Sequence, residues 1–345
     1  MRKIRVAING FGRIGRSFFK VARKCEDLEI VAINDLGEIE NLAYLLKYDS
    51  VYGKSDFTVG VVTGHNQALV VEGKEVAFLS EKDPEKLPWK HMEVDVVVES
   101  TGLFRSYDKA KAHLDAGAKR VVISAPAKGQ ASAGVSGATV LMGINEHDLK
   151  GAEISSNASC TTNAGGPLIS ILHEVLGIEK ALLNTIHAYT SSQAVVDSPR
   201  RDDFRRGRAA AHNIVPSSTG AAIAVTKAIP DLNDLFDGIA VRVPVLTGSL
   251  VDVTFVSKRG TTAEEVNEIL TKASHDPRWK GLFTVTDEPI VSSDIIGDPH
   301  SSIADLSFTR VVGGNLVKVL AWYDNEMGYA HTLVTHVLKA GSYLE

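Results

Sequence analysis

The sequence predicts an α/β fold in which a doubly wound parallel sheet is followed by an α+β domain. Three observations lead to this prediction. Short apolar runs alternate with helical patterns in the first part of the chain, a glycine-rich turn follows the first run, and longer β-rich runs replace the alternation after Cys160. With 345 residues the chain is too long for one ordinary hydrophobic core, so we expect two domains.

A βαβ unit opens the chain. The pattern predicts a strand at Ile4–Ile8, a helix at Ser17–Lys24 and a strand at Glu29–Asn34. The turn between them reads Gly10-x-Gly12-x-x-Gly15, and its glycines let backbone N–H groups approach a pyrophosphate at a helix N-terminus. Asp35 ends the second strand, where a carboxylate can accept hydrogen bonds from a ribose hydroxyl. Together these features favour a Rossmann-type dinucleotide fold over a tight turn that needs glycine for backbone reasons alone.

The alternation continues through two more strands and then stops. Strands at Val94–Glu99 and Arg120–Ser124 enclose a helix at Lys109–Ala118, which implies a parallel sheet with ligands at the carboxyl ends of its strands. Later β-rich runs, with helices between them, indicate an α+β domain and are found at Ala181–Ile186, Gly238–Arg242, Ser249–Ser257 and Asn315–Trp322. The boundary is expected near Ser155–Cys160.

Charge and cysteine content restrict the function. The net charge of -5 argues against binding nucleic acid or an anionic membrane through the overall field. Cys25 and Cys160 offer no disulfide framework, which fits a reducing compartment and makes the cytoplasm the expected location. The first apolar stretch stops at Asn9, too early for a signal peptide or a membrane span. Cysteine and histidine spacing predicts no metal site, and no nucleotide-triphosphate loop is found.

Cys160 has the surroundings of a nucleophile. It precedes an apolar run, Pro167–Leu176, that predicts a helix, and its neighbours are polar: Ser159, Thr161, Thr162 and Asn163. A helix N-terminus and an adjacent imidazolium are expected to lower the thiol pKa by roughly two or more units and make the thiolate the majority form. His187 follows a strand-like run 27 positions later and is the candidate general base. Cys25, inside a helix, is expected to be a packed apolar residue.

The segment Ser198–Arg208 carries five arginines against two aspartates. A solvated loop with local ion pairs, a nucleic-acid patch and a phosphate-binding site are all open interpretations of this composition. Ser217–Gly220 supplies hydroxyls and a glycine amide before another expected helix, a composition that suits an anion cradle or an ordinary helix cap.

Five stretches spread over the chain match one family. They are Ile8–Arg16 (INGFGRIGR), Leu45–Ser50 (LLKYDS), Ser124–Gly129 (SAPAKG), Ser156–Asn163 (SNASCTTN) and Trp322–Glu326 (WYDNE). On these stretches the whole chain resembles the phosphorylating glyceraldehyde-3-phosphate dehydrogenases. The matches are long and widely spaced, which makes the resemblance specific.

The resemblance implies a domain organisation and a reaction. It assigns NAD binding to a Rossmann domain over residues 1–158 and catalysis to an α+β domain over 159–325. The sequence pattern itself predicts a last helix at Met327–Leu338, within 326–345, that we expect to pack back on the first domain. The resemblance also implies a glycolytic homotetramer that oxidises glyceraldehyde 3-phosphate to 1,3-bisphosphoglycerate, with hydride transfer to NAD. Cys160 would be the nucleophile, carrying a hemithioacetal and then a thioester, and His187 would be its base.

The family's binding residues carry over by position. The cofactor would contact Gly10, Phe11, Gly12, Arg13, Ile14, Gly15, Asp35, Leu36, Thr101, Ser124 and Asn325, with Asn325 holding the nicotinamide carboxamide. The substrate phosphate would be held by Thr190 and Arg242. Attacking inorganic phosphate would be bound by Ser159, Thr161, Arg206, Thr219 and Gly220. The arginine-rich segment would lie at the tetramer core near a neighbour's cofactor.

Three positions depart from the family pattern. Ala164 stands where the family usually has a second cysteine, so an intrahelical disulfide with Cys160 is impossible. Met327 stands in place of a usual tryptophan. Ser198 precedes Pro199 where NAD-specific members often have leucine, and small polar residues there accompany use of NADP. Asp35 favours NAD because a carboxylate repels a 2′-phosphate, so NAD is expected and NADP stays open.

Two competing interpretations remain. Erythrose-4-phosphate dehydrogenase shares the cysteine and cofactor motifs, although His187–Thr190 and Ser218–Gly220 match the glyceraldehyde type better. A nucleic-acid-binding protein on the same fold would use the arginine-rich segment as its contact. The joint presence of Cys160, His187, Thr190 and Arg242 argues against that second interpretation.

Overall fold

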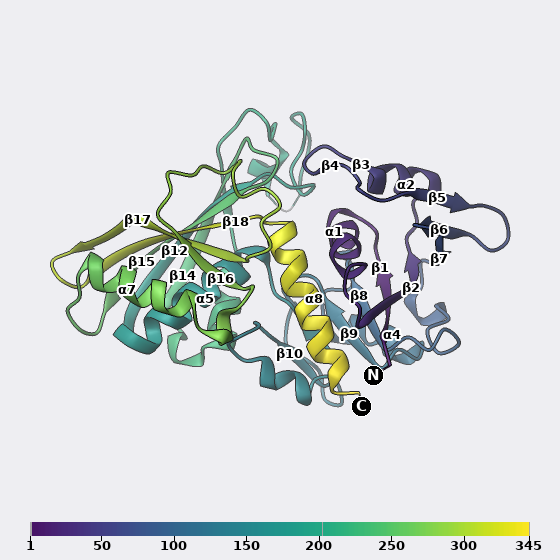
Figure 1. Cartoon of the computed structure of the whole chain (residues 1–345), viewed down its shortest axis with the longest axis horizontal. Helices are drawn as coiled ribbons and strands as arrows, with labels where there is room; N and C mark the ends of the chain where they lie inside the picture. The colour runs from purple at the N-terminus through teal and green to yellow at the C-terminus, as the bar shows by residue number, and fades with distance from the viewer. Residues whose placement is uncertain (1, 202, 345) are drawn as a thin grey trace. The chain divides into compact units, whose positions relative to one another are not determined.

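The computed structural model describes residues 2–201 and 203–344, which form two compact units (Figure 1). Unit 1 comprises Met1–Val140, Glu146–Ala158 and Ala330–Glu345, and unit 2 comprises Leu141–Asn145 and Ser159–Tyr329. Asp202, part of the arginine-rich segment, lies outside the described residues. Each unit has its own sheet and its own helices.

The sheet of unit 1 has the strand order β10-β11-β9-β8-β1-β2-β7-β6-β5. Neighbours from β10 to β7 pair in parallel, and β6 pairs antiparallel with both β7 and β5. The chain leaves β1 for β2 on one side and returns to β8 on the other, which places a topological switch point at the carboxyl end of β1. The strands are β1 (Ile4–Asn9), β2 (Leu28–Asn34), β5 (Val59–Val62), β6 (Ala68–Val71), β7 (Lys74–Leu79), β8 (Val96–Glu99), β9 (Arg120–Ile123), β10 (Gly137–Thr139) and β11 (Ile154–Ser156).

The other elements of unit 1 are short, apart from α1 and α2. They are α1 (Arg13–Ala22), α2 (Ile39–Lys47), α3 (Tyr107–Ala110), α4 (Ala112–Asp115), the 3-10 turns η1 (Pro84–Lys86) and η2 (Glu146–Lys150), and the hairpin of β3 (Tyr48–Asp49) and β4 (Gly53–Lys54). The prediction of one helix at Lys109–Ala118 was wrong. The helical segment begins two residues earlier because the Ser106 hydroxyl accepts from the Lys109 amide, and Lys111 divides it into two short helices.

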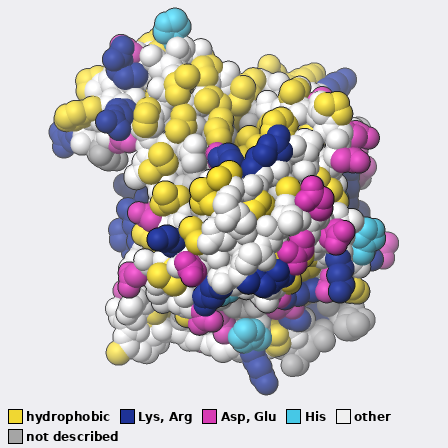
Figure 2. Space-filling view, turned by 90° about the vertical axis from the view of Figure 1, so that its left-hand side faces the viewer, with side chains coloured by type: hydrophobic (Ala, Val, Ile, Leu, Met, Phe, Trp, Pro, Cys, Tyr) yellow, Lys and Arg dark blue, Asp and Glu magenta, His cyan; other side chains and the backbone are white. Residues whose placement is uncertain are grey.

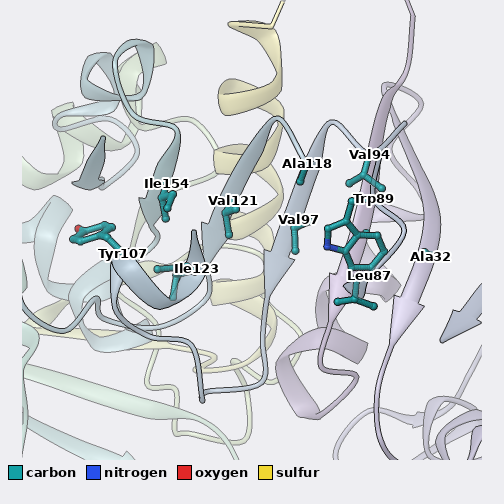
Figure 3. Close-up of a cluster of buried hydrophobic side chains, with 12 residues drawn as sticks. Ala32, Leu87, Trp89, Val94, Val97, Tyr107, Ala118, Val121, Ile123 and Ile154 are labelled. Carbon is teal, nitrogen blue, oxygen red and sulfur yellow. The ribbon is translucent and has the colours of Figure 1, made fainter. Parts of the chain in front are cut away.

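Every residue of β8 and β9 is buried, so both faces of this part of the parallel sheet are covered. Figure 3 shows the indole of Trp89 among the aliphatic side chains of Leu87, Val94 and Val97. Trp89 and Val97 are completely buried. This cluster fixes the β8 side of the sheet.

The sheet of unit 2 is mixed, as expected for an α+β domain. Its strand order is β13-β14-β12-β15-β18-β17-β16. Alternation along these strands separates an inner face, on which α5, α6 and α7 pack, from an outer face. The strands are β12 (Ile178–Ala188), β13 (Val215–Ser218), β14 (Phe236–Val243), β15 (Ser249–Ser257), β16 (Phe283–Thr286), β17 (Ser302–Val312) and β18 (Leu316–Tyr323). The predicted fold class is confirmed.

The helices of unit 2 include the one that begins at Cys160. They are α5 (Cys160–Leu176), α6 (Ala221–Ala228), α7 (Ala263–Ser274), and the turns η3 (Phe204–Gly207), η4 (Pro230–Leu232) and η5 (Pro277–Trp279); α8 (Met327–Ser342) starts in unit 2 and continues into unit 1. The sequence predicted α5 only from Pro167. The helix starts seven residues earlier because Ser159 and Thr162 form a capping box, and Pro167 is accommodated in its interior.

The surface and composition of the described residues add three findings. Figure 2 shows hydrophobic side chains gathered on part of the surface that it draws, beside areas rich in charged side chains. No helix in residues 2–201 and 203–344 has the length and apolar character needed to cross a membrane. The same residues contain no group of three or more His, Cys, Asp and Glu side chains arranged to hold a metal ion.

Candidate active site

The cofactor residues predicted in unit 1 follow the carboxyl ends of four adjacent strands. Gly10 follows β1, Asp35 follows β2, Thr101 follows β8 and Ser124 follows β9. Since parallel strands end at the same edge of a sheet, the structure brings these residues together at the switch point. Leu36 beside Asp35 is 60% exposed, so its side chain is available to a ligand.

The glycine turn fits a bound dinucleotide. Gly10 has φ +96, and a Cβ there would lie 2.6 Å from the Thr101 amide nitrogen. A Cβ on Gly15 would overlap the carbonyl oxygen of Gly10. Gly12 is different, because a Cβ there would meet nothing within 4 Å. The protein itself therefore needs Gly10 and Gly15, whereas the open space at Gly12 suits a ligand that approaches the backbone closely.

The start of α1 also fits an anion. Gly12 is its N-cap, and no side chain caps the helix. The first amides of a helix have no acceptor inside the helix, and the helix dipole favours negative charge there. Arg13 and Ile14 begin this first turn, whereas the side chain of Phe11 is buried and contributes only its backbone.

Asp35 stabilises the same turn. One carboxylate oxygen accepts from the Phe11 amide at 2.6 Å, and the other accepts from the Gly37 amide at 2.8 Å. A carboxylate oxygen can accept more than one hydrogen bond, so both oxygens keep capacity for ribose hydroxyls. The residues present at this edge therefore fit NAD.

In unit 2, Cys160 is the first residue of α5 and faces the inner side of the sheet. His187 on β12 and Arg242 on β14 are paired in register on neighbouring parallel strands, and their side chains alternate to the helix-covered face. Cys160 Sγ lies 3.3 Å from His187 Nε2. The structure thus brings together the two residues predicted as nucleophile and base.

His187 Nδ1 lies close to one hydrogen-bond acceptor and one hydrogen-bond donor. The carbonyl oxygen of Ala188 lies at 2.6 Å and the Arg242 Nη1 donor lies at 2.7 Å. Arg242 Nη1 also donates to the Ala188 carbonyl at 3.0 Å. The ring is 3% exposed, so these contacts fix its orientation and turn Nε2 toward the sulfur.

The expected imidazolium beside Cys160 is not found. Burial, and then the charge of Arg242, lower the pKa of His187 to about 3, so the ring is neutral near pH 7. Burial also raises the pKa of the Cys160 thiol, although Arg242 and the amide and hydroxyl of Thr161 oppose this. The sequence predicted a lowered thiol pKa with the thiolate as the majority form, and this prediction was wrong, because the pKa is raised. The prediction included the effects of the helix and the imidazole but omitted desolvation of the thiolate.

Sequence reasoning missed Tyr323 and Thr185. The Tyr323 hydroxyl lies 2.9 Å from the Thr161 hydroxyl and 2.8 Å from that of Thr185, and all three groups are buried. Burial raises the pKa of Tyr323, which keeps the hydroxyl protonated. One sequence signal could have pointed to Tyr323: it occupies an inward-facing position in the alternating pattern of β18.

The residues predicted to bind phosphate lie on several elements of unit 2. Arg206 in η3 donates to the Ser217 hydroxyl through Nε at 2.8 Å and Nη2 at 2.6 Å. Burial, and to a smaller extent the charge of Arg206, lower the pKa of Arg242, so the two guanidinium groups are close enough to interact electrostatically. The Ser159 hydroxyl already accepts from the Thr162 amide in the cap of α5, and the Thr161 hydroxyl is already paired with that of Tyr323. Thr219 and Gly220 precede α6, and Thr190 follows β12 with its hydroxyl 2.8 Å from that of Ser192.

Asn325 is held in one orientation. Its Oδ1 accepts from the Ser249 hydroxyl at 2.9 Å, the Gly248 amide at 3.2 Å and the Thr247 hydroxyl at 3.3 Å. These bonds use the carbonyl oxygen and not the amide nitrogen, which can donate to the oxygen of a carboxamide.

A glycine turn at the switch point of a doubly wound sheet, together with a separate unit carrying a cysteine–histidine pair, defines an NAD-dependent oxidoreductase. Comparison with known proteins narrows this class. The family model described as glyceraldehyde 3-phosphate dehydrogenase, NAD binding domain, matches residues 4–107, and that described as its C-terminal domain matches residues 159–325. The chain belongs to the glyceraldehyde-3-phosphate dehydrogenase family, as its sequence motifs predicted.

Curated relatives match almost the full length. The chain is 50% identical to glyceraldehyde-3-phosphate dehydrogenase of Thermotoga maritima over 333 residues, covering 96% of this chain and 97% of the relative. It is 47% identical to that of Geobacillus stearothermophilus, covering 96% of each chain. It is 46% identical to glyceraldehyde-3-phosphate dehydrogenase 2 of Streptomyces arenae, covering 99% of each.

Proposed function

We propose that this chain catalyses the phosphorylating oxidation of glyceraldehyde 3-phosphate to 1,3-bisphosphoglycerate. The observation that supports this best is the distance of 3.3 Å between Cys160 Sγ, at the start of α5, and His187 Nε2. Family membership supports the substrate, since the relatives carry the name of this dehydrogenase. NAD, when bound, accepts the hydride that the aldehyde carbon loses.

The chemistry begins with addition of sulfur to the aldehyde. His187 Nε2 takes the thiol proton as Cys160 Sγ bonds to the carbonyl carbon, and it returns that proton to the oxygen to give a hemithioacetal. When the hydride leaves, Nε2 takes the hydroxyl proton and a thioester remains. This step needs a neutral ring with a lone pair at Nε2. The low pKa of His187 keeps the ring neutral, and an Nδ1–H that donates to the Ala188 carbonyl leaves the lone pair at Nε2.

Inorganic phosphate completes the reaction. A phosphate oxygen attacks the thioester carbon, the carbon–sulfur bond breaks, and the sulfur leaves as a thiolate, which His187 reprotonates. Two anion sites are needed around one sulfur. We assign the substrate phosphate to Arg242 and Thr190, and the attacking phosphate to Arg206, Thr219 and Gly220 with Ser159 and Thr161, because arginine's planar fork suits phosphate.

An absorbance assay tests the proposal. Formation of reduced nicotinamide is measured with glyceraldehyde 3-phosphate and phosphate, with NAD and NADP supplied in turn. We expect turnover that requires phosphate, with NAD preferred because Asp35 disfavours a 2′-phosphate. Faster turnover of erythrose 4-phosphate would contradict the substrate assignment, and equal rates with NADP would show dual cofactor use.

We also propose that the chain forms a homotetramer and acts in the cytoplasm. Family resemblance supports the tetramer, and so does the outer face of the unit 2 sheet, where a groove of about 810 Å³ is bordered by the exposed Leu182 and Leu316. The arginine-rich segment adds Val195 and Phe204, each 83% exposed. Large apolar side chains exposed to this degree are typical of interfaces. Light scattering after size exclusion should give four times the chain mass of 37.0 kDa.

A further inference from the structure

A chain of hydrogen bonds runs through the interior of unit 1 to the edge where the cofactor is expected. Trp89 Nε1 donates to His113 Nδ1 at 3.0 Å, and His113 Nε2 lies 3.1 Å from Glu99 Oε2. Trp89, His113 and Glu99 are at most 1% exposed. We propose that Glu99, oriented by His113 and Trp89, is a positioning residue that holds the ends of β1 and β8 in the conformation that binds NAD.

The direction of each hydrogen bond follows from the groups present. An indole N–H can only donate, so His113 Nδ1 must be the acceptor and the ring proton lies on Nε2. Nε2–H therefore donates to Glu99. The histidine is the neutral link between a tryptophan in the core and a carboxylate at the edge of the sheet.

The carboxylate of Glu99 connects two strand ends. Oε2 also accepts from Asn9 Nδ2 at 2.6 Å, at the end of β1. Oε1 accepts from the Thr101 amide at 2.8 Å and from the Thr101 hydroxyl. Four donors from three residues fill the acceptor positions of this carboxylate. The side chain is thereby fixed on both sides, as a positioning group requires.

The strand ends joined in this way carry predicted cofactor residues. Gly10 follows Asn9 and lies against Thr101, with a distance of 2.6 Å from its ideal Cβ position to the Thr101 amide nitrogen. Asn9 Oδ1 accepts from Asn34 Nδ2 at 2.7 Å, which extends the connection to the end of β2 before Asp35. A shift of Glu99 would move Thr101 and the glycine turn relative to each other.

Trp89, at the other end of this chain of hydrogen bonds, is held in place by the packing around it. Trp89 is completely buried in the apolar cluster of unit 1, between Leu87, Val94 and Val97 (Figure 3). A group attached to such packed side chains has little freedom to move. Glu99, His113 and Trp89 all belong to unit 1, so the inference depends on NAD binding and not on the proposed roles of Cys160 and His187.

The test compares three variants in the full-length protein. Glu99→Gln replaces an acceptor oxygen with a donor. His113→Leu removes the link, whereas His113→Gln can keep an N–H toward Glu99 and an acceptor toward Trp89. NAD affinity is measured by calorimetric titration without aldehyde, and steady-state kinetics separate kcat from the KM for NAD. His336→Leu, which removes another buried histidine of unit 1, is the control.

We expect Glu99→Gln and His113→Leu to weaken NAD binding by about tenfold or more and to raise the KM for NAD equally, with kcat at saturating NAD within about twofold. His113→Gln should restore most of the affinity, and His336→Leu should leave it unchanged. Unchanged NAD affinity in His113→Leu would overturn the proposal. An equal loss of affinity in His336→Leu would do the same, because it would show a general effect of destabilising unit 1.

Discussion

Arg242 acts on both members of the candidate catalytic pair. Its guanidinium lies 2.7 Å from His187 Nδ1, where its charge helps to lower the pKa of the ring. The same charge lowers the pKa of Cys160 and so opposes the effect of burial on the thiol. Arg242 therefore adds to the effect of burial on the base and opposes it on the nucleophile, while burial is the larger cause for both groups. A residue assigned to the substrate phosphate would thus also influence the resting protonation of the pair.

Replacing His187 tests its role as base. We expect His187→Asn to lower turnover by about a hundred- to a thousandfold, because a positioned proton acceptor and donor is lost, and to leave NAD affinity unchanged. Steady-state assays and NAD titration measure the two quantities. Near-normal turnover would remove His187 from the mechanism.

Replacing Cys160 tests the covalent step. Cys160→Ser should abolish dehydrogenase activity, because a neutral hydroxyl is a much weaker nucleophile than a thiolate. The matched control is Cys25→Ser, at the other cysteine of the chain, which should keep near wild-type activity. Substantial residual dehydrogenase activity in Cys160→Ser would contradict the assignment.

Oxidation of Cys160 should not produce an internal disulfide. Ala164, one turn further along α5, offers no sulfur, so peroxide is expected to give a sulfenic acid or a mixed disulfide with added thiol. Mass spectrometry after brief peroxide treatment, with and without a sulfenic-acid trap, distinguishes these products. Rapid formation of an internal disulfide would contradict this expectation.

At the level of elements, the site is assembled from the inner face of one sheet and the first turn of α5. Thr185 and His187 lie on β12, Arg242 on β14 and Tyr323 on β18, all at positions that alternate toward the helices. Motifs in the sequence predicted the glycine turn, Cys160 and His187, and the family resemblance added Arg242. They could not identify Tyr323, because its role depends on pairing between strands that lie far apart in the sequence.

The predicted starts of two helices, α1 and α5, lay several residues too late in the sequence. Proline and glycine are usually read as helix boundaries, so α5 was expected to begin at Pro167 and α1 after Gly15. In the structure both helices begin earlier, at Cys160 and Arg13. The capping box and the close approach of Gly15 to Gly10 determine these starts, and both depend on three-dimensional contacts.

Removing the Tyr323 hydroxyl should affect α5. Tyr323→Phe leaves the Thr161 and Thr185 hydroxyls without their shared partner, so we expect a loss of roughly 1–3 kcal/mol in the free energy of unfolding. The Thr161 hydroxyl that faces Cys160 should also lose its orientation, which slows alkylation of the sulfur. Thermal unfolding and alkylation rates measure both effects. Tyr44→Phe, at a residue 59% exposed, is the control, and equal changes in both variants would contradict the prediction.

At the level of the whole molecule, the last helix completes the first unit. His336 on α8 lies 2.7 Å from the Ser155 hydroxyl and 3.1 Å from Asn157 Oδ1, and it is completely buried. Asn157 also donates to Thr332 at 3.2 Å. Unit 1 is thus formed from two segments that lie far apart in the sequence. The sequence predicted the last helix, but its contacts with Ser155 and Asn157 join distant segments, which local patterns do not show.

His336 should make the protein sensitive to acid. Burial lowers its pKa to about 3, whereas the unfolded chain takes up this proton near pH 6.5. The neutral ring therefore contributes its full stability above pH 6.5, and the contribution is lost as the pH falls toward 3. Between pH 8 and pH 5 the loss amounts to about 2 kcal/mol.

We expect His336→Gln to show a smaller fall in unfolding temperature between pH 8 and pH 5 than the wild type. Calorimetry at both pH values measures this difference. His147→Gln is the matched control, since the side chain of His147 is 79% exposed. An identical pH dependence in the wild type and in His336→Gln would show that His336 does not contribute to the acid sensitivity.

The assignment of Ala330–Glu345 to unit 1 has a consequence for biosynthesis. On the ribosome, residues 1–158 emerge before the helix that contacts Ser155 and Asn157. The intervening polypeptide of unit 2 must be translated before that helix becomes available. The nascent N-terminal part should therefore stay incompletely folded until Ala330–Ser342 has been translated.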